Sequence, residues 1–285
     1  MQDWKESKAI MDGIDNLLKD VEMVEIKKGL AHSLKTSGKR LRPLTLLLTA
    51  ELNNGTVEHA LDAALALECI HTASLIQDDI LDEGLKRRGE PTSHEKFGLF
   101  LAMVCNDYLI SKSMMLISKY DQPSITAFGL SGLLAAEGEL LDIKSRTFKA
   151  TEDDYFECVL KKTAAMFIAA FEIGARSAGT SEEKALLCRE MGKEFGIAYQ
   201  IVDDLIEFLS IDDDTKKSAQ QSYILPLVYM EKMSSDEAVD RCMKHVETSI
   251  ARIDEMLKNF DDGEAKKKLI DVIDILRNYN GVKIK

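Results

Sequence analysis

The chain has 285 residues, of which 45% are hydrophobic and 30% charged, and its formal net charge is −12. A chain of this length can bury a large core, and its acidic balance argues against nucleic acid as a partner. The five cysteines are scattered without a CxxC pair, so the sequence indicates neither a disulfide framework nor a zinc site. No apolar run reaches the roughly 20 residues of a membrane span, and the first ten residues lack a signal-peptide pattern. We therefore expect a cytosolic protein without a transmembrane segment.

Helix-forming residues dominate the sequence, which has only four prolines and sixteen glycines. We predict an all-α, single-domain bundle of ten or more helices spanning residues 1–285, without strands. The apolar periodicity places helices at about 5–34, from 43 onward, and at 57–82, 95–120, 124–145, 151–179, 181–210, 236–260 and 263–278. Thr56, Thr151 and either Thr180 or Ser181 are the expected helix caps.

Two acidic clusters lie inside otherwise apolar helices. Asp78 and Asp79 interrupt one apolar run, and Asp82 follows Asp78 by four residues, on the same helix face. Asp203 and Asp204 repeat the arrangement in a later helix. Like charges on one face are destabilising, and carboxylate oxygens are ligands that Mg²⁺ prefers. A solvated helix face explains one such cluster, but two embedded clusters favour a metal site.

Basic residues are concentrated in two segments. The segment Gly38–Pro43 places Lys39, Arg40 and Arg42 between a helix-breaking glycine and a proline suited to a first helical turn. A helix N-terminus of this kind binds phosphate, although a solvated basic turn is an equal alternative on this segment alone. The second segment, 86–88, directly follows the first acidic cluster, and it can pair with that cluster or share an anionic ligand with it.

Two further residues are candidates for the same site. His71 precedes Asp78 by seven residues on roughly the same helix face, which favours a role beside the metal, with a core histidine as the alternative. Glu68 and His71 form an ExxH pair, but a di-iron bundle needs two such pairs and only one is present. Lys162 precedes a long small-and-apolar run, so a buried role is as plausible as a surface one.

Together, these motifs resemble those of the trans-isoprenyl diphosphate synthase (polyprenyl synthetase) family over nearly the whole chain. The resemblance rests, in this order, on the segments Gly38–Pro43, Glu68–Asp82, Arg87–Gly89, Lys162–Ala164 and Tyr199–Asp204. It implies a helical bundle of the isoprenoid synthase type around a central cavity, two or three Mg²⁺ ions in each active site, and a homodimer.

The resemblance also assigns residues and a reaction. It implies Mg²⁺ ligands at Asp78, Asp82 and Asp203, with Asp79, Asp204 and Lys162 completing the catalytic set. It implies isopentenyl diphosphate contacts at Lys39, Arg42, His71 and Arg88, allylic diphosphate contacts at Arg87, Lys162 and Gln200, and Thr163 beside the reacting carbon. In the family, Mg²⁺-assisted loss of the allylic diphosphate leaves a carbocation, which the double bond of isopentenyl diphosphate attacks. The released diphosphate takes the proton, so no protein base is required.

Product length is expected to depend on the residues that line the tunnel below the aspartates. The family resemblance places Ala73 and Ser74 there, and neither side chain is bulky enough to stop a short chain. We therefore expect a product of C20 or longer. Ile70, Tyr108 and Phe167 are candidates for a deeper floor.

The sequence departs from the family pattern after the second cluster. Glu207 stands where the family usually has aspartate, and no glycine occurs between Gly196 and Gly263, so Lys216 or Lys217 would have to replace a missing Gly-Lys contact. This leaves open a weakly active or regulatory subunit of a heteromeric prenyl diphosphate synthase. A class I terpene cyclase would share the metal site but would have no need of a second diphosphate pocket.

Overall fold

The computed structural model describes residues 1–36, 38–145, 151–210 and 224–277. More than ten α-helices and one short hairpin make up this part of the chain, so the predicted all-α bundle of ten or more helices is confirmed. The helices are α1 (Lys5–Lys19), α2 (Val24–Thr36), α3 (Leu41–Leu52), α4 (Val57–Leu81), α5 (Ser93–Phe97), α6 (Leu99–Ile117), α7 (Gln122–Ser145), α8 (Glu152–Val159), α9 (Ala165–Ser177), α10 (Glu182–Ser210), α12 (Leu225–Met230), α13 (Ser235–Leu257) and α14 (Glu264–Arg277).

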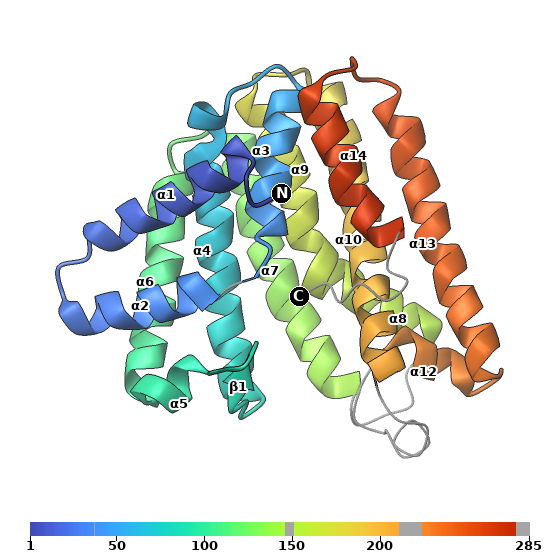
Figure 1. The fold of residues 1–285 in the computed structure, drawn as a ribbon, viewed down its shortest axis with the longest axis horizontal. Helices are drawn as coiled ribbons and strands as arrows, with labels where there is room; N and C mark the ends of the chain where they lie inside the picture. The colour runs from blue at the N-terminus through green and yellow to red at the C-terminus, as the bar shows by residue number, and fades with distance from the viewer. Residues whose placement is uncertain (37, 146–150, 211–223, 278–285) are drawn as a thin grey trace.

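Helix α9 occupies the centre of the bundle and packs against α3, α4, α7 and α10. Figure 1 shows α13 and α14 on one side of this centre and the α1–α2 pair on the other. Nearly every α9 residue is buried, and so is most of α3. This explains why both helices read as continuous apolar runs rather than amphipathic ones.

Glycines allow the central helices to approach one another closely. A Cβ atom at Gly138 of α7 would lie 2.3 Å from the backbone nitrogen of Lys162. On α10, a Cβ at Gly196 would lie 2.6 Å from the Cα of Ala164, and one at Gly192 would lie 2.6 Å from a backbone oxygen of α9. No side chain fits at these three positions, so the helices can pack backbone against backbone. Helices α7 and α10 thereby enclose the segment that joins α8 to α9 from two sides.

That enclosed chain is a π-helical turn, η1 (Leu160–Ala164). The helix predicted over 151–179 therefore consists of α8, η1 and α9, and it ends before Gly179 as expected. Apolar periodicity does not reveal a π turn because one extra residue barely disturbs the pattern. The turn matters for the site because it contains Lys162 and Thr163, and π turns are frequent at functional sites.

Three other expectations about secondary structure are wrong. The helix predicted over 5–34 breaks at residues 20–23, where the chain turns back so that α2 packs against α6. The helix predicted over 95–120 breaks at Gly98, whose φ of 83° is left-handed and is readily adopted only by glycine. The loop after α4 contains an antiparallel pair, β1 (Lys86–Arg87) and β2 (Glu90–Pro91), although no strand was expected.

The expected caps are present. The side chain of Thr56 accepts a hydrogen bond from the backbone of His59, and Thr151 forms a capping box with Asp154. Ser181 rather than Thr180 accepts from the first turn of α10, at 3.4 Å. All five cysteines are buried and unpaired.

Helix α6 is the one described helix that is long and apolar enough to cross a membrane by length and composition, although polar residues interrupt its apolar run. One side of it packs against α4. Asp107 lies exposed near its middle, where a charge in hydrocarbon is costly.

Glycine substitutions on α7 test the close packing. We expect Gly138→Ala to lower the free energy of unfolding by about 1–3 kcal/mol, because the backbone of Lys162 would have to move. Gly129 lies on the same helix, and a Cβ placed there would have no atom within 4 Å, so Gly129→Ala should instead raise stability by about 0.5–1 kcal/mol. Urea unfolding followed by circular dichroism measures both. Equal effects of the two substitutions would contradict the close approach of α7 to Lys162.

Candidate active site

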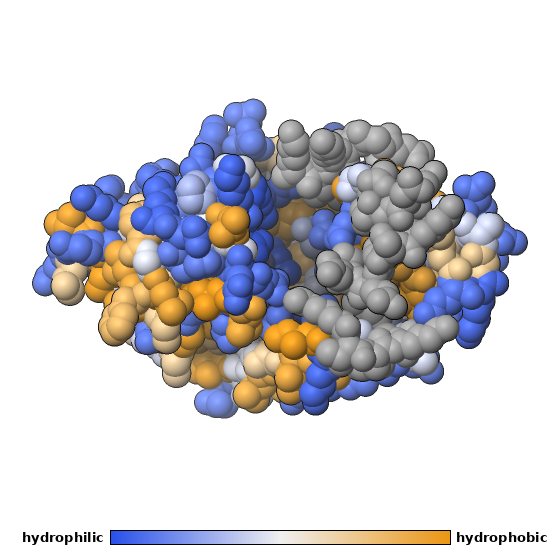
Figure 2. Space-filling model, turned by 90° about the horizontal axis from the view of Figure 1, so that it is seen from below, coloured by the Kyte–Doolittle hydropathy of each residue, from blue (hydrophilic) through white to orange (hydrophobic). Residues whose placement is uncertain are grey.

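A cavity of about 1260 Å³ lies between α3, α4, α6, α7, the π turn and α10. Pockets for single drug-sized ligands are usually about 300–1,000 Å³, so this one is large enough for two substrates. Figure 2 shows the molecule hollowed at the end where α5 and α12 lie, with hydrophilic residues along one side of the opening. Charged side chains line one part of the cavity, and small apolar ones line another.

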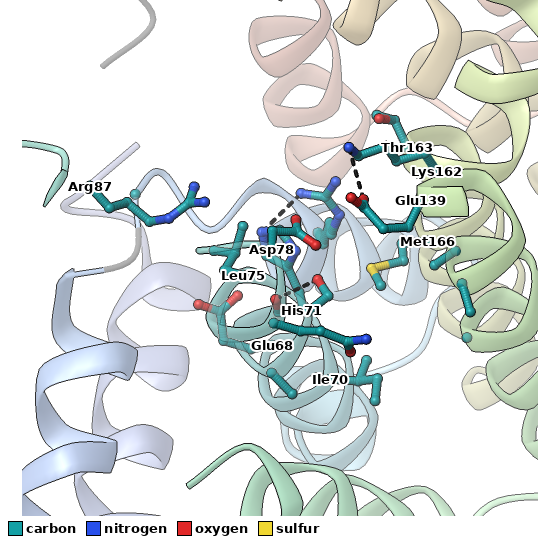
Figure 3. A pocket seen from close by; sticks show the side chains of 18 of the residues that line it. Glu68, Ile70, His71, Leu75, Asp78, Arg87, Glu139, Lys162, Thr163 and Met166 are labelled. Atoms are coloured by element: carbon teal, nitrogen blue, oxygen red, sulfur yellow. Dashed lines mark hydrogen bonds and ion pairs between the residues drawn. The ribbon is translucent and has the colours of Figure 1, made fainter. Parts of the chain in front are cut away.

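The first acidic cluster lies on the last turns of α4, and its three aspartates have different surroundings. Asp78 lines the cavity (Figure 3), and burial together with the nearby charge of Glu139 raises its pKa to about 7. Asp82 caps the C-terminal end of α4 and is exposed, close enough for its charge to act on Asp78. The like charges expected from the sequence therefore do lie together.

Asp79 points away from the cavity and pairs with Arg87. The Nε of Arg87 donates to both carboxylate oxygens, at 2.9 and 3.0 Å, and Nη2 lies 2.8 Å from Oδ1. This bidentate pair ties the β1–β2 hairpin to α4. Arg87 also lines the cavity, so it is held at the cavity edge by Asp79.

In the second acidic cluster, too, one aspartate lines the cavity and its neighbour binds protein groups. Asp203 lines the cavity, and its pKa is raised by partial desolvation and by the charge of exposed Glu207. Asp204 is only 2% exposed and faces the protein interior. Its Oδ2 accepts from the Tyr155 hydroxyl at 2.6 Å and from the backbone N–H of Leu225 at 3.0 Å. Asp204 thus joins α8, α10 and the start of α12, and burial raises its pKa to about 7.

Four groups form a basic pocket beside the acidic ones: Lys39, Arg42, His71 and Arg88, all lining the cavity. Arg42 Nη1 lies 3.2 Å from His71 Nε2, and the guanidinium stacks on the ring of Phe167 at 4.7 Å. Burial and the neighbouring arginines hold the pKa of His71 well below its usual range. The imidazole is therefore neutral, so Nε2 accepts from Arg42 and Nδ1 bears the proton.

Arg40, the third cation of this segment, has a different role. Its Nη1 lies 2.7 Å from Glu68 Oε1, and Nη2 donates to the backbone oxygen of Leu34. Glu68 is 1% exposed, so this is a buried ion pair at the start of α3. Glu68 therefore serves to hold the basic segment in place, and the ExxH pair does not form a metal site.

Lys162 emerges from the π turn between two acidic residues of α7. Its Nζ lies 2.8 Å from Glu139 Oε2 and 2.7 Å from Asp142 Oδ2. Both acids lie outside the sites predicted from the sequence, although they interrupt an apolar helix as Asp78 does. The same signal could have found them. Burial opposes the charge of Lys162, but the two carboxylates outweigh it and raise the pKa, so the ammonium is retained.

Thr163 and Gln200 form a short hydrogen-bonded chain with Asp204. The Thr163 hydroxyl donates to Gln200 Oε1 at 2.7 Å, and Gln200 Nε2 donates to Asp204 Oδ1 at 2.8 Å. Both residues line the cavity. The chain fixes the orientation of the Gln200 amide, because its oxygen and its nitrogen each have a partner.

Magnesium fits the donors of this cavity. Asp78 and Asp203 are hard-oxygen groups on separate helices, and Glu139 Oε1 is buried with no hydrogen-bond partner among the described residues. Within the described ranges, no three acidic, histidine or cysteine side chains lie close enough to form a ready-made metal site. A cation between the carboxylates would offset their mutual repulsion.

The apolar part of the cavity begins one turn before Asp78. Ala73, Ser74 and Ile70 line it from α4, facing Asn106 and Ile110 of α6 and small residues of α7. Two candidates for a deeper floor lie elsewhere. Phe167 packs beneath Arg42, and Tyr108 packs against the core outside the lining.

Comparison with known proteins identifies the family. A family model described as polyprenyl synthetase matches residues 24–260. The chain belongs to the polyprenyl synthetase family. It is an isoprenyl diphosphate synthase, a prenyltransferase of a family that uses divalent metal ions with isopentenyl and allylic diphosphates.

Several relatives extend over most of the chain. Geranylfarnesyl diphosphate synthase of Methanosarcina mazei is 41% identical over 276 residues, which cover 97% of this chain and 93% of that protein. Geranylgeranyl diphosphate synthase of the same organism is 35% identical over 70% of this chain and 64% of its own length. A crystal structure of a geranyltranstransferase from Methanosarcina mazei aligns with a TM-score of 0.84 at 40% identity, covering 96% of this chain and 97% of that one.

The family resemblance weakens in a segment outside the described residues. Lys216 and Lys217, the candidates for the missing Gly-Lys contact, both lie in 211–223. The described chain resumes at 224, and the start of α12 at Leu225 is held by Asp204.

Gly38 gives a test of the basic pocket. A Cβ at this position would lie 2.6–2.8 Å from the guanidinium of Arg88, whose Nη1 donates to the backbone oxygen of Thr36 at 3.3 Å. Gly38→Ala should displace this flexible group without disturbing the fold. We expect the KM for isopentenyl diphosphate to rise about tenfold, as for the loss of one charge-assisted hydrogen bond, with kcat little changed.

The matched variants are Arg88→Gln and the double substitution. If Gly38→Ala acts through Arg88, the two changes together should raise KM no more than Arg88→Gln alone. Steady-state kinetics with isopentenyl diphosphate as the varied substrate decides this. Fully additive effects would show that Gly38 acts in another way.

Proposed function

We propose that this synthase condenses isopentenyl diphosphate with an allylic diphosphate to give a prenyl diphosphate of C20 or C25. The observation that supports this most directly is the division of charge within one cavity. Asp78 and Asp203 offer oxygen ligands for metal-bound diphosphate, and the neighbouring pocket of Lys39, Arg42 and Arg88 suits a diphosphate without metal. A terpene cyclase, which binds a single diphosphate, would not need that second pocket.

The residues divide the work by charge and position. Lys39, Arg42, Arg88 and the Nδ1–H of His71 would bind the diphosphate of isopentenyl diphosphate. Lys162, Arg87 and Gln200 would contact the allylic diphosphate, with Thr163 near the reacting carbon. Fixed cations at these points stabilise charge that develops on the departing diphosphate. No side chain is assigned as a general base, because the released diphosphate can accept the proton.

The metal site would use Asp78, Asp82 and Asp203, with Asp79 and Asp204 holding the surrounding structure. We propose two or three Mg²⁺ ions in each active site. When bound, they supply Lewis-acid stabilisation of the leaving diphosphate. Asp79 and Asp204 are less suited to direct binding, because Arg87 occupies the first and Tyr155, Gln200 and Leu225 occupy the second.

A product assay tests this proposal. The purified chain is incubated with Mg²⁺, labelled isopentenyl diphosphate and, separately, C5, C10, C15 and C20 primers, and products are sized after removal of phosphate. We expect a prenyl product, and we expect Asp78→Ala to lower turnover by more than about 100-fold, since loss of an outer-shell partner alone costs about 10–100-fold. Turnover that does not depend on Asp78 would contradict the proposal. Primer-dependent thermal stabilisation without turnover would support the regulatory subunit of a heteromeric synthase.

Product length is proposed from the lining and from the relatives. Ala73 and Ser74 leave the apolar cavity open one turn below Asp78, and Ile70 is the next side chain on α4. Two of the similar proteins are named for geranylfarnesyl (C25) and geranylgeranyl (C20) products. Both observations favour a long product.

We expect Ser74→Phe to shorten the main product by one or more C5 units, because an aromatic ring at this level would fill the cavity. Ser74→Ala is the matched control, since it removes the hydroxyl that donates to the His71 backbone at 2.8 Å without adding bulk. The same product assay gives both lengths. Wild-type products from Ser74→Phe would show that the growing chain takes another path.

We further propose a cytosolic homodimer in which each chain is a single polyprenyl synthetase-like domain. Phe100, 89% exposed on α6, and Leu133, 67% exposed on α7, belong to an apolar surface that a second copy would cover. Light scattering should give a dimer for the wild type and a monomer for Leu133→Glu. Leu186→Glu, at an exposed leucine of α10, should leave the dimer intact. A monomeric wild type would exclude this proposal.

A further inference from the structure

Glu139 of α7 lies inside the cavity, although it belongs to neither aspartate-rich segment. Its side chain is 12% exposed and lines the cavity with Asp78 of α4. Figure 3 shows the two carboxylates pointing into the same space from different helices. Glu139 contributes more than any other charged group to raising the pKa of Asp78, after burial itself, so the two groups are close.

The two oxygens of Glu139 have different surroundings. Oε2 lies 2.8 Å from Lys162 Nζ. Oε1 is buried and has no hydrogen-bond partner among the described residues. Buried carboxylate oxygens are costly when unpaired, so a group that binds Oε1 when the cavity is filled would account for its position.

The charges around Lys162 show that Glu139 is not needed for neutralisation. Asp142 Oδ2 already lies 2.7 Å from the same ammonium. Two carboxylates and one lysine leave a net negative charge, and Asp78 adds another at close range. An excess of buried negative charge made of hard oxygens is the environment that Mg²⁺ binds. Lys162, being already paired, cannot supply the balancing charge.

We propose that Glu139 is an additional oxygen ligand of the divalent cation that Asp78 binds. Helix α7 then joins α4 and α10 in holding the metal–diphosphate complex. This inference rests on the proposed function, because it concerns the same metal site. It differs from the simpler view, in which Glu139 only positions Lys162, by predicting a direct effect on metal affinity.

The experiment measures metal binding rather than turnover. The full chain is titrated with Mn²⁺ in the presence of inorganic diphosphate, and free Mn²⁺ is followed by electron paramagnetic resonance. We expect Glu139→Gln to raise the Kd for Mn²⁺ by at least about tenfold. Asp142→Asn is the matched control, because it removes the other carboxylate on Lys162 and should leave the Kd unchanged. Thermal unfolding checks that each variant is folded.

Two further variants separate the possible outcomes. Glu139→Asp keeps the charge but withdraws the oxygens, so it should weaken Mn²⁺ binding if contact is required. Equal Kd values for Glu139→Gln, Asp142→Asn and the wild type would overturn the inference. Asp78→Asn tests the proposed function independently. Unchanged diphosphate-dependent Mn²⁺ binding in that variant would contradict the proposed metal site itself. Loss of binding in Asp78→Asn but not in Glu139→Gln would leave the function standing and exclude only the role of Glu139.

Discussion

The structure depends on backbone-to-backbone packing around α9 and the π turn that precedes it. Gly138 and Gly196 bring α7 and α10 onto the turn, and Gly174 brings α9 so near α3 that a Cβ there would lie 2.4 Å from a backbone oxygen. Close packing of this kind leaves little freedom for the segment it encloses. Lys162 is therefore held between the acids of α7 by the helices themselves, and its long side chain has few other conformations available.

Once these helices are fixed, the positions of the charged groups follow. Helices α4, α7 and α10 place Asp78, Glu139 and Asp203 around one part of the cavity, and the start of α3 places Arg42 beside them. In each pair of adjacent aspartates, the two side chains then have different roles. Asp78 and Asp203 face the cavity, whereas Asp79 and Asp204 bind protein groups that hold the hairpin and α12 in place. Adjacent carboxylates on a helix point in different directions, so one can serve the site and the other its support.

Much of the site could be predicted from the sequence, because charged side chains stand in helices whose other residues call for burial. Charges within apolar helices must have a reason, and Asp78 and Asp203 were found in this way, whereas Arg42 was found in a basic segment at a predicted helix N-terminus. Glu139 gave the same signal, with Glu137 and Asp142 close by in the sequence, but it belongs to neither pair of adjacent aspartates and was overlooked. The π turn could not be predicted, since it depends on contacts from Gly138 and Gly196, which are distant in sequence. The break at 20–23 likewise goes with the packing of α2 against α6, whereas the break at Gly98 had a local signal in the glycine itself.

Helices α6 and α7 each have an inner side that lines the cavity and an outer side that is exposed. Their inner sides line the apolar cavity through Asn106, Ile110 and Ala136, and their outer sides form the exposed apolar surface that includes Phe100. Only one layer of helix therefore separates the growing prenyl chain from whatever covers that surface. If a second copy of the chain covers that surface, as proposed above, a bulky product would press on the neighbouring subunit through this single layer. Selection for product length and selection for assembly would then act on the same two helices, so neither property could evolve without constraining the other.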